Sequence, residues 1–365
     1  MEEYNPKYAG CLLGMAIGDA MGCTIDGRTW QDIQKTYGRR GLLGFDLQSR
    51  EYAAVTSYTQ IAAYLCNGLL LGLTRNKHEL MRYGKLALRE WTRSQQFYRD
   101  PEESYCWLAK LPQFRRRQCR DARMLDNLRI EAFGTMDDPK NDNRAPGAIT
   151  AGIAAGMYYL PGRIPTERVG TLACDLIALT HGNPDAFLSG AVLAYTIAGI
   201  LQEPDCPLEE QFTQAIAAVD GQFRGRFPQV ELLARQLRDA ILLARAGVYA
   251  PQEGMEQLRC LDAAQCLAGA MFACLLYPED FDSAIVTAVN HSGASAAVGA
   301  ITGAILGAKM GEGMLPAFYL ESLECGDALR EIACDMAWAT PLMGLFDDNW
   351  DQKYNQGLPP EELTP

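Results

Sequence analysis

The sequence is short of basic residues. Its 33 lysines and arginines stand against 45 aspartates and glutamates, which gives the 365-residue chain a formal net charge of −12. Non-specific nucleic-acid binding requires an excess of cationic side chains that displace phosphate counterions. The one dense basic run, Arg115 to Arg117 followed by Arg120 and Arg123, has acidic residues around it and is predicted to be a solvated helix face. We therefore expect no nucleic-acid partner.

Motifs for structural metals and disulfides are also missing. The three histidines, His78, His181 and His291, lie too far apart in the sequence to predict a zinc site. The 12 cysteines are scattered singly without a Cys-x-x-Cys pair, and no secretory signal is found at the start. We expect reduced thiols that pack mostly as small apolar side chains.

Long apolar runs are absent as well. None reaches the roughly 18 residues expected of a membrane span. The closest, Phe187 to Leu201, is followed by Gln202 and Glu203 and is predicted to be a buried core helix. These absences predict a cytoplasmic protein without a membrane partner.

Alternating strand patterns are nearly absent, whereas helical spacing recurs along the whole chain. Proline and glycine separate the helical segments, and no low-complexity linker divides them. We predict one all-α domain over residues 1–345, followed by a loosely packed or disordered tail over 346–365. The predicted helices are Tyr8–Met21, Thr59–Leu73, Glu79–Thr92, Gly147–Leu160, Thr166–Leu179, Asp185–Leu201, Leu208–Val219, Gln229–Ala246, Leu261–Leu276, Phe281–Ala288, Ser295–Met310 and Gly326–Met336.

Two of these segments carry a glycine at every fourth position. The first ladder is Gly10, Gly14, Gly18 and Gly22, and the second is Gly299, Gly303, Gly307 and Gly311. Each glycine costs about 1 kcal/mol relative to alanine inside a helix, so a compensating gain is required. A bare helix face lets another helix approach closely. We predict that the ladders are structural and pack on each other or on common neighbours.

Four segments of the chain form a recognisable series of motifs. They are Gly-Cys-Leu-Leu-Gly-Met-Ala-Ile-Gly-Asp-Ala-Met-Gly at 10–22, Thr-Ser-Tyr-Thr-Gln at 56–60, Leu-Thr-His-Gly-Asn-Pro at 179–184, and Asn-His-Ser-Gly-Ala-Ser-Ala-Ala-Val-Gly-Ala-Ile-Thr-Gly at 290–303. In this order they resemble the ADP-ribosylglycohydrolases, which include the hydrolases that reactivate ADP-ribosylated nitrogenase reductase. The resemblance covers the chain from about Gly10 to Met336.

The resemblance implies an orthogonal all-α bundle whose central cleft holds two Mg²⁺ ions. Members of the family use this cleft to bind ADP-ribose and to cleave its bond to a protein side chain or another acceptor. Two aspartates of an early loop and two of a late loop hold the ions. Mg²⁺ prefers oxygen ligands in octahedral geometry, and once bound it can orient the ribose and activate a water.

The sequence departs from the family at all four metal-binding aspartates. Ser57 and Tyr58 stand in place of the first pair, and Ala294 and Ala296 stand in place of the second. Neutral side chains cannot offset the charge of two divalent ions. The degenerate positions are Thr56, Ser57, Tyr58, Ala294, Ala296 and Ala297, of which only Thr56 keeps an oxygen-bearing side chain that matches the family motif. We therefore expect no metal and no cofactor, and Tyr58 is expected to fill part of the vacated volume.

Several residues remain as candidates for the cleft, although none is a confident catalytic residue. Asp26 is either a residual general acid/base or an ordinary loop carboxylate. Asp19 either contacts a ligand or makes a hydrogen bond within the bundle, and His291 either contacts a ligand or is structural. His181 is expected to orient the turn at Gly182–Pro184. The candidate cleft residues are Asp19, Asp26, Gly147, His291, Ser292, Gly293 and Ser295.

Three hypotheses about function follow from these patterns, and they leave open whether the protein is an enzyme. The first is an inactive homologue, a pseudoenzyme, whose cleft or surface binds ADP-ribose, an ADP-ribosylated protein or another protein partner. The second is an active, metal-independent or atypical ADP-ribosyl hydrolase that uses Asp26 with the hydroxyl of Ser57 or Tyr58. The third is a structural or assembly protein.

Overall fold

The computed structural model describes residues 5–47, 50–75, 79–96, 104–116, 121–338 and 348–354. Within these ranges the chain folds into 17 α-helices without a β-strand, and the only β-type pairing is an isolated bridge between Ala53 and Leu323. The predicted all-α class is confirmed.

The helices follow one another along the whole chain. The first eight are α1 (Pro6–Cys23), α2 (Trp30–Tyr37), α3 (Ser57–Arg75), α4 (Leu80–Gln96), α5 (Ala122–Arg129), α6 (Ala151–Tyr158), α7 (Thr166–Ala178) and α8 (Pro184–Gln202). The others are α9 (Leu208–Phe223), α10 (Gln229–Ala246), α11 (Pro251–Leu258), α12 (Ala263–Leu276), α13 (Phe281–Val289), α14 (Ser295–Met310), α15 (Ala317–Glu321), α16 (Gly326–Ala337) and α17 (Asp348–Tyr354). Short 3₁₀ turns add η2 (Trp107–Lys110), η3 (Pro112–Arg115), η4 (Pro146–Ala148) and η5 (Glu312–Met314).

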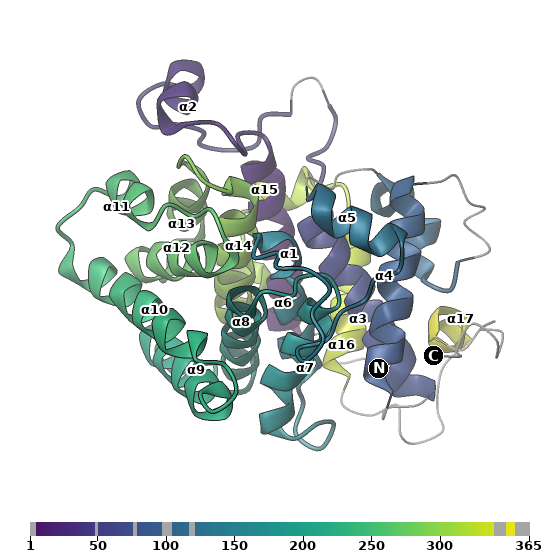
Figure 1. The fold of residues 1–365 in the computed structure, drawn as a ribbon. Coiled ribbons are helices and arrows are strands. Elements are labelled where there is room, and N and C mark those ends of the chain that lie inside the picture. The colour runs from purple at the N-terminus through teal and green to yellow at the C-terminus, as the bar shows by residue number, and fades with distance from the viewer. Residues whose placement is uncertain are drawn as a thin grey trace.

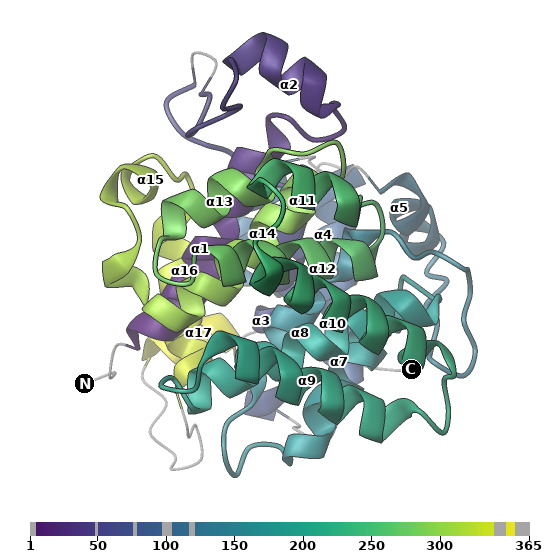
Figure 2. The same ribbon diagram turned by 90° about the vertical axis from the view of Figure 1, so that its left-hand side faces the viewer.

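Helices α1 and α14 lie side by side at the centre of the molecule. Helices α9 to α13 lie on one side of this pair, and α3, α4 and α17 lie on the other (Figure 1). Helix α2 stands at the edge of the bundle in both views (Figure 2). The first and the fourteenth helix form the centre of the bundle, and α3, α8, α12, α13 and α16 pack on them.

The two glycine ladders pack directly on each other between α1 and α14. This is the first of the two predicted arrangements. A Cβ atom on Gly14 would lie 2.1 Å from the carbonyl oxygen of Gly303, and one on Gly303 would lie 1.9 Å from the carbonyl oxygen of Gly14. Gly18 faces Gly299 in the same way. The two backbones are in contact at these glycines, so no side chain fits at these positions. The close approach is the gain that offsets the low helix propensity of glycine.

Every predicted helix is present, whereas α2, α5, α11, α15 and α17 were not predicted. Each of these five has at most eight residues and therefore a short helical repeat, whereas α6, also of eight residues, lies within the longer predicted segment Gly147–Leu160. Two of them, α2 and α5, are marked by side-chain caps instead. Thr29 caps α2 by accepting a hydrogen bond from the Asp32 amide, and Asp121 caps α5 by accepting one from the Met124 amide.

The predicted loose tail is wrong for the part that the structure describes. Residues Asp348–Tyr354 form α17, in which Trp350 is 1% exposed and Tyr354 is fully buried. The Lys353 ammonium and the Tyr354 hydroxyl both donate to the buried carboxylate of Asp335 on α16, each at 2.6 Å. Two aromatic rings one helical turn apart were the sequence signal for this docking. Residues 355–365 lie outside the described part of the chain.

Helix α8 is the one described helix that is long and apolar enough to cross a membrane. In the fold 72% of that apolar window is buried by neighbouring helices. The prediction of a buried core helix is confirmed. The 11 described cysteines are free thiols, most of them buried.

Candidate functional site

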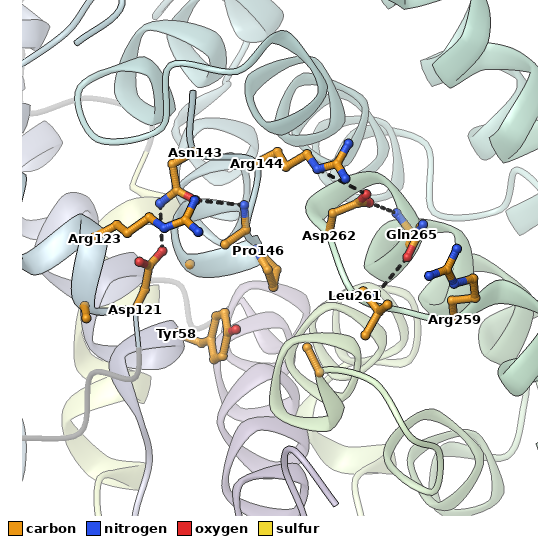
Figure 3. Close-up of a pocket in the computed structure, with 14 residues that line it drawn as sticks. Tyr58, Asp121, Arg123, Asn143, Arg144, Pro146, Arg259, Leu261, Asp262 and Gln265 are labelled. Carbon is orange, nitrogen blue, oxygen red and sulfur yellow. Dashed lines mark hydrogen bonds and ion pairs between the residues drawn. The ribbon is translucent and has the colours of Figure 1, made fainter. Parts of the chain in front are cut away.

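The early and late loops that resemble the metal loops of the family meet at one cavity. Tyr58, in the first turn of α3, and Ala294, just before α14, both line a cleft of about 570 Å³. Figure 3 shows the Tyr58 ring at the floor of this cleft, which remains open beside it. The Tyr58 carbonyl accepts a hydrogen bond from the Thr150 hydroxyl at 2.9 Å, which ties α3 to the start of α6. Sequence positions far apart thus build one site.

Asp19 stabilises the start of α3. Its side chain is fully buried and accepts hydrogen bonds from the amides of Thr56 and Thr59 at 2.8 and 3.2 Å. The hydroxyls of the same two threonines donate at 2.6 and 2.7 Å. Burial raises the pKa of Asp19 to about 6, although these hydrogen bonds act in the opposite direction. The expected hydrogen bond within the bundle is confirmed, and Asp19 serves as a helix cap supplied from α1.

Asp26 plays the equivalent part for α14. The N-cap residue of this helix, Ala294, has no side chain that can cap it. Instead, Oδ1 of Asp26 accepts a hydrogen bond from the Ala296 amide at 3.2 Å. Burial raises the pKa of the nearby Tyr58 hydroxyl well above its usual value, and the negative charge of Asp26 adds to this shift. The phenol therefore stays protonated at neutral pH, and one carboxylate oxygen of Asp26 binds the helix end.

The segment that precedes α14 is held mainly by contacts within the protein. His291 is 1% exposed, and its Nδ1 accepts a hydrogen bond from the Gly293 amide at 2.9 Å. The Ser292 hydroxyl accepts from the Trp30 amide at 2.9 Å, and the buried Ser295 hydroxyl donates to the His291 carbonyl at 3.4 Å. These contacts fix the loop to the start of α2. Of the predicted cleft residues only Gly147 lines the cavity, so ligand contacts by the others remain a prediction.

Burial of His291 has a measurable consequence for stability. Desolvation lowers its pKa to about 4, against about 6.5 in the unfolded chain. Between these values the unfolded state binds a proton that the folded state does not, so stability is lost as the pH falls through this window. Between pH 7 and pH 5 the unsubstituted protein should lose unfolding free energy through the protonation of His291 in the unfolded state. We expect the His291→Gln variant to lose about 2 kcal/mol less over the same pH range. Urea unfolding of both proteins at the two pH values measures the difference, and equal losses would contradict it.

The rim of the cavity holds a hydrogen-bonded cluster around Asp121. Its Oδ2 accepts from Nδ2 of Asn143 and pairs with Nε2 of His181, both at 3.0 Å. Burial would raise the pKa of Asp121, but the bonds from His181, the Met124 amide and Asn143 bring it to about 2. A Cβ on Gly147 would lie 2.6 Å from the same carboxylate oxygen, so only glycine allows this approach.

His181 does not orient the Gly182–Pro184 turn as expected. Its ring bonds to Asp121 and to the Thr180 hydroxyl, and it thereby supports the cavity rim. The turn is held instead by Asn141, whose Oδ1 accepts from the Gly182 amide at 3.0 Å. The sequence motif marks His181 as a structural residue, but its partner Asp121 lies 60 positions away in the sequence and could not be predicted from the motif.

Other residues that line the cavity were not predicted from the sequence. They are Arg123, Arg144, Arg259, Leu261, Asp262 and Gln265, together with Asp121 and Asn143. Arg123 is exposed, as the predicted solvated face implied, but it also lines the cavity. The Arg117 and Arg120 part of that prediction lies outside the described residues. No motif marks Arg259, because the fold alone brings it to the cleft.

The residues that replace the four metal-binding aspartates of the family do not fit a pair of Mg²⁺ ions. Ser57, Tyr58, Ala294 and Ala296 offer at most neutral hydroxyls where two divalent charges need carboxylates. The Thr56 hydroxyl donates to Asp19, and Ala297 is fully buried. In the part of the chain that the structure describes, no group of three or more histidine, cysteine, aspartate or glutamate residues could hold a metal ion.

Comparison with known proteins agrees with this architecture. A family model for ADP-ribosylglycohydrolase matches residues 1–349 of the chain. A solved structure described as an ADP-ribosylglycohydrolase-related protein complex superimposes with a TM-score of 0.55 and 20% identity, covering 92% of this chain and 98% of the other. At that identity the second match supports the fold alone. No curated protein matches the chain. With four motifs in order, an all-α fold and a family match over nearly its whole length, the chain belongs to the ADP-ribosylglycohydrolase family.

Proposed function

We propose that this protein is an inactive member of the family whose cleft binds an ADP-ribose-type ligand, free or attached to a protein, without Mg²⁺. The observation that carries the proposal is that the cavity is preserved although the metal-binding residues beside it are replaced. A cavity of about 570 Å³ persists where the two loops meet, yet the carboxylates that hold the ions in the family are replaced. That volume lies within the range of about 300–1,000 Å³ common for small-molecule sites.

The state of the packing around the cleft also supports a binding role. Asp19 and Asp26 still cap the two helices that carry the altered loops. The amides of Thr56, Thr59 and Ala296 at the starts of these helices therefore have carboxylate acceptors from within the protein. Binding can thus be kept while hydrolysis, which needs a polarised water, is lost. We place this function in the cytoplasm, with no nucleic-acid or membrane partner.

The alternative, an active metal-independent hydrolase, requires Asp26 to act with the hydroxyl of Ser57 or Tyr58. Geometry disfavours it, because Oδ1 of Asp26 already accepts a hydrogen bond from the Ala296 amide. The raised pKa of Tyr58 keeps its phenol neutral, and Ser57 is only 5% exposed. The structural or assembly hypothesis predicts no ligand in the cleft at all.

A hydrolysis assay separates the inactive from the active reading. Purified protein is incubated with an ADP-ribosylated peptide and Mg²⁺, and released ADP-ribose is measured against an active member of the family. We expect no release above the enzyme-free rate, in both the unsubstituted protein and Asp26→Asn. Release that Asp26→Asn abolishes would establish the metal-independent enzyme and overturn the inactive reading.

A further inference from the structure

Three arginines line the cavity, and each comes from a different segment. Arg123 lies in the first turn of α5, Arg144 in the loop before η4, and Arg259 just after α11. In Figure 3 Arg123 lies on one side of the cleft, Arg259 on the other and Arg144 between them, with Tyr58 below. These three residues are far apart in the sequence, and the packing of the helices brings their side chains to one cavity.

The carboxylates of the cavity are already engaged by other groups. Asp121 is bonded to His181 and Asn143, and Oδ1 of Asp262 accepts from the Gln265 amide at 2.9 Å. Only Arg144 approaches a carboxylate, with its Nε 4.0 Å from Asp262. Within the described ranges neither Arg123 nor Arg259 forms an ion pair. A chain of net charge −12 therefore presents two guanidinium groups that form no ion pair with Asp121 or Asp262, the carboxylates that line the same cleft.

The backbone that carries Arg259 is held in an uncommon conformation. Arg259 and Cys260 have φ angles of 62° and 52°, in the left-handed region that side chains other than glycine rarely adopt. Such residues cost of order 1–3 kcal/mol each and persist only where the surrounding structure fixes them. Here the Cys260 carbonyl accepts from the Ala294 amide at 2.8 Å. The same loop is tied to the Arg144 segment, since the Ala263 amide donates to the Arg144 carbonyl at 3.0 Å.

We propose that Arg123, Arg144 and Arg259 bind the phosphate groups of a diphosphate-bearing ligand directly, without a metal ion. Guanidinium groups form paired, charge-assisted hydrogen bonds with phosphate oxygens. Tyr58 and Ala294 beneath them carry no charge of their own, and the two carboxylates that line the cavity, Asp121 and Asp262, are engaged by His181, Asn143 and the Gln265 amide. This inference rests on the proposed function. It adds that the diphosphate is the recognised part of the ligand and that the three arginines recognise it.

Calorimetric titrations in EDTA test the arginine site. The probes are ADP-ribose, inorganic pyrophosphate and adenosine, and the proteins are unsubstituted, Arg123→Gln, Arg259→Gln and the control Arg235→Gln. Arg235 is exposed on α10 and does not line the cavity. We expect each cavity variant to bind ADP-ribose and pyrophosphate roughly 10- to 100-fold more weakly. Arg235→Gln should bind them as the unsubstituted protein does. Adenosine binding, where it is measurable, should not change, and thermal melts confirm that the variants are folded.

The outcomes separate this inference from the proposed function. Equal ADP-ribose affinity in the unsubstituted protein, Arg123→Gln and Arg259→Gln would overturn the arginine site and leave the proposed function standing. Pyrophosphate binding that Arg259→Gln abolishes, without any ADP-ribose binding, would support the arginine site and contradict the proposed ligand. Failure of all three probes to bind the unsubstituted protein would overturn both.

Discussion

The Gly303→Ala variant is expected to lose about 3 kcal/mol or more of unfolding free energy. The added Cβ would lie 1.9 Å from the carbonyl oxygen of Gly14 and 2.5 Å from its carbonyl carbon. Backbone atoms cannot rotate away as a flexible side chain can, so α1 and α14 would have to separate. Separation would open the centre of the bundle, where close packing leaves few alternatives. Urea unfolding measures the effect.

Gly221→Ala is the matched control for this substitution. Gly221 lies in α9, is exposed, and has no atom within 4 Å of an added Cβ. Helix propensity alone predicts a gain of about 0.5–1 kcal/mol there. The same gain should appear at Gly303 if the ladders were not in contact. Equal stability changes at the two positions would therefore show that close approach of the ladders does not hold the fold together.

Restoring aspartate at positions 57, 58, 294 and 296 together is expected to create a Mg²⁺ site. The cleft lining unites Tyr58 with Ala294, and Asp26 links the second loop to the end of α1, so the four new carboxylates would converge. Without metal the crowded, partly buried charges should lower the melting temperature. Mg²⁺ at about 100 times its dissociation constant should restore about 2.7 kcal/mol. The unsubstituted protein should show no such response.

A variant with asparagine at the same four positions provides the control. It has nearly the same side-chain volume but lacks the negative charge that Mg²⁺ requires. Melting curves in EDTA and with increasing Mg²⁺ distinguish the two variants. A folded aspartate variant that ignores Mg²⁺ would show that these positions are not the vacated ligand positions, and the explanation of the inactive cleft would fail.

Much of the fold could be predicted from the sequence because its signals are local. Helical spacing over ten or more residues located every long helix, and the glycine ladders predicted a close helix pair. The short helices α5 and α11 escaped, since one or two turns do not establish a repeat. Trp350 and Tyr354 show the same limit, because they lie in a docked helix of seven residues where the sequence predicts a loose tail.

Some residues of the cleft could be predicted from the sequence and others could not, for a physical reason. Tyr58 and Ala294 stood out because they interrupt recognisable motifs. Arg259 interrupts no motif, and its placement beside Arg144 depends on contacts between distant segments, such as the Ala263 amide bonded to the Arg144 carbonyl. The left-handed backbone at Arg259 also carries no sequence signal, because glycine is the residue expected there. Groups assembled by tertiary contacts become visible only in the folded chain.

The central claim is that the cleft binds an ADP-ribose-type ligand without a metal. Its most direct test is a calorimetric titration of the unsubstituted protein with ADP-ribose, first with Mg²⁺ and then with EDTA. Metal-free recognition predicts the same dissociation constant in both buffers. Binding that requires Mg²⁺ would contradict the claim and restore the case for a working hydrolase. Absence of binding in both buffers would equally contradict it, and would favour a structural or assembly protein.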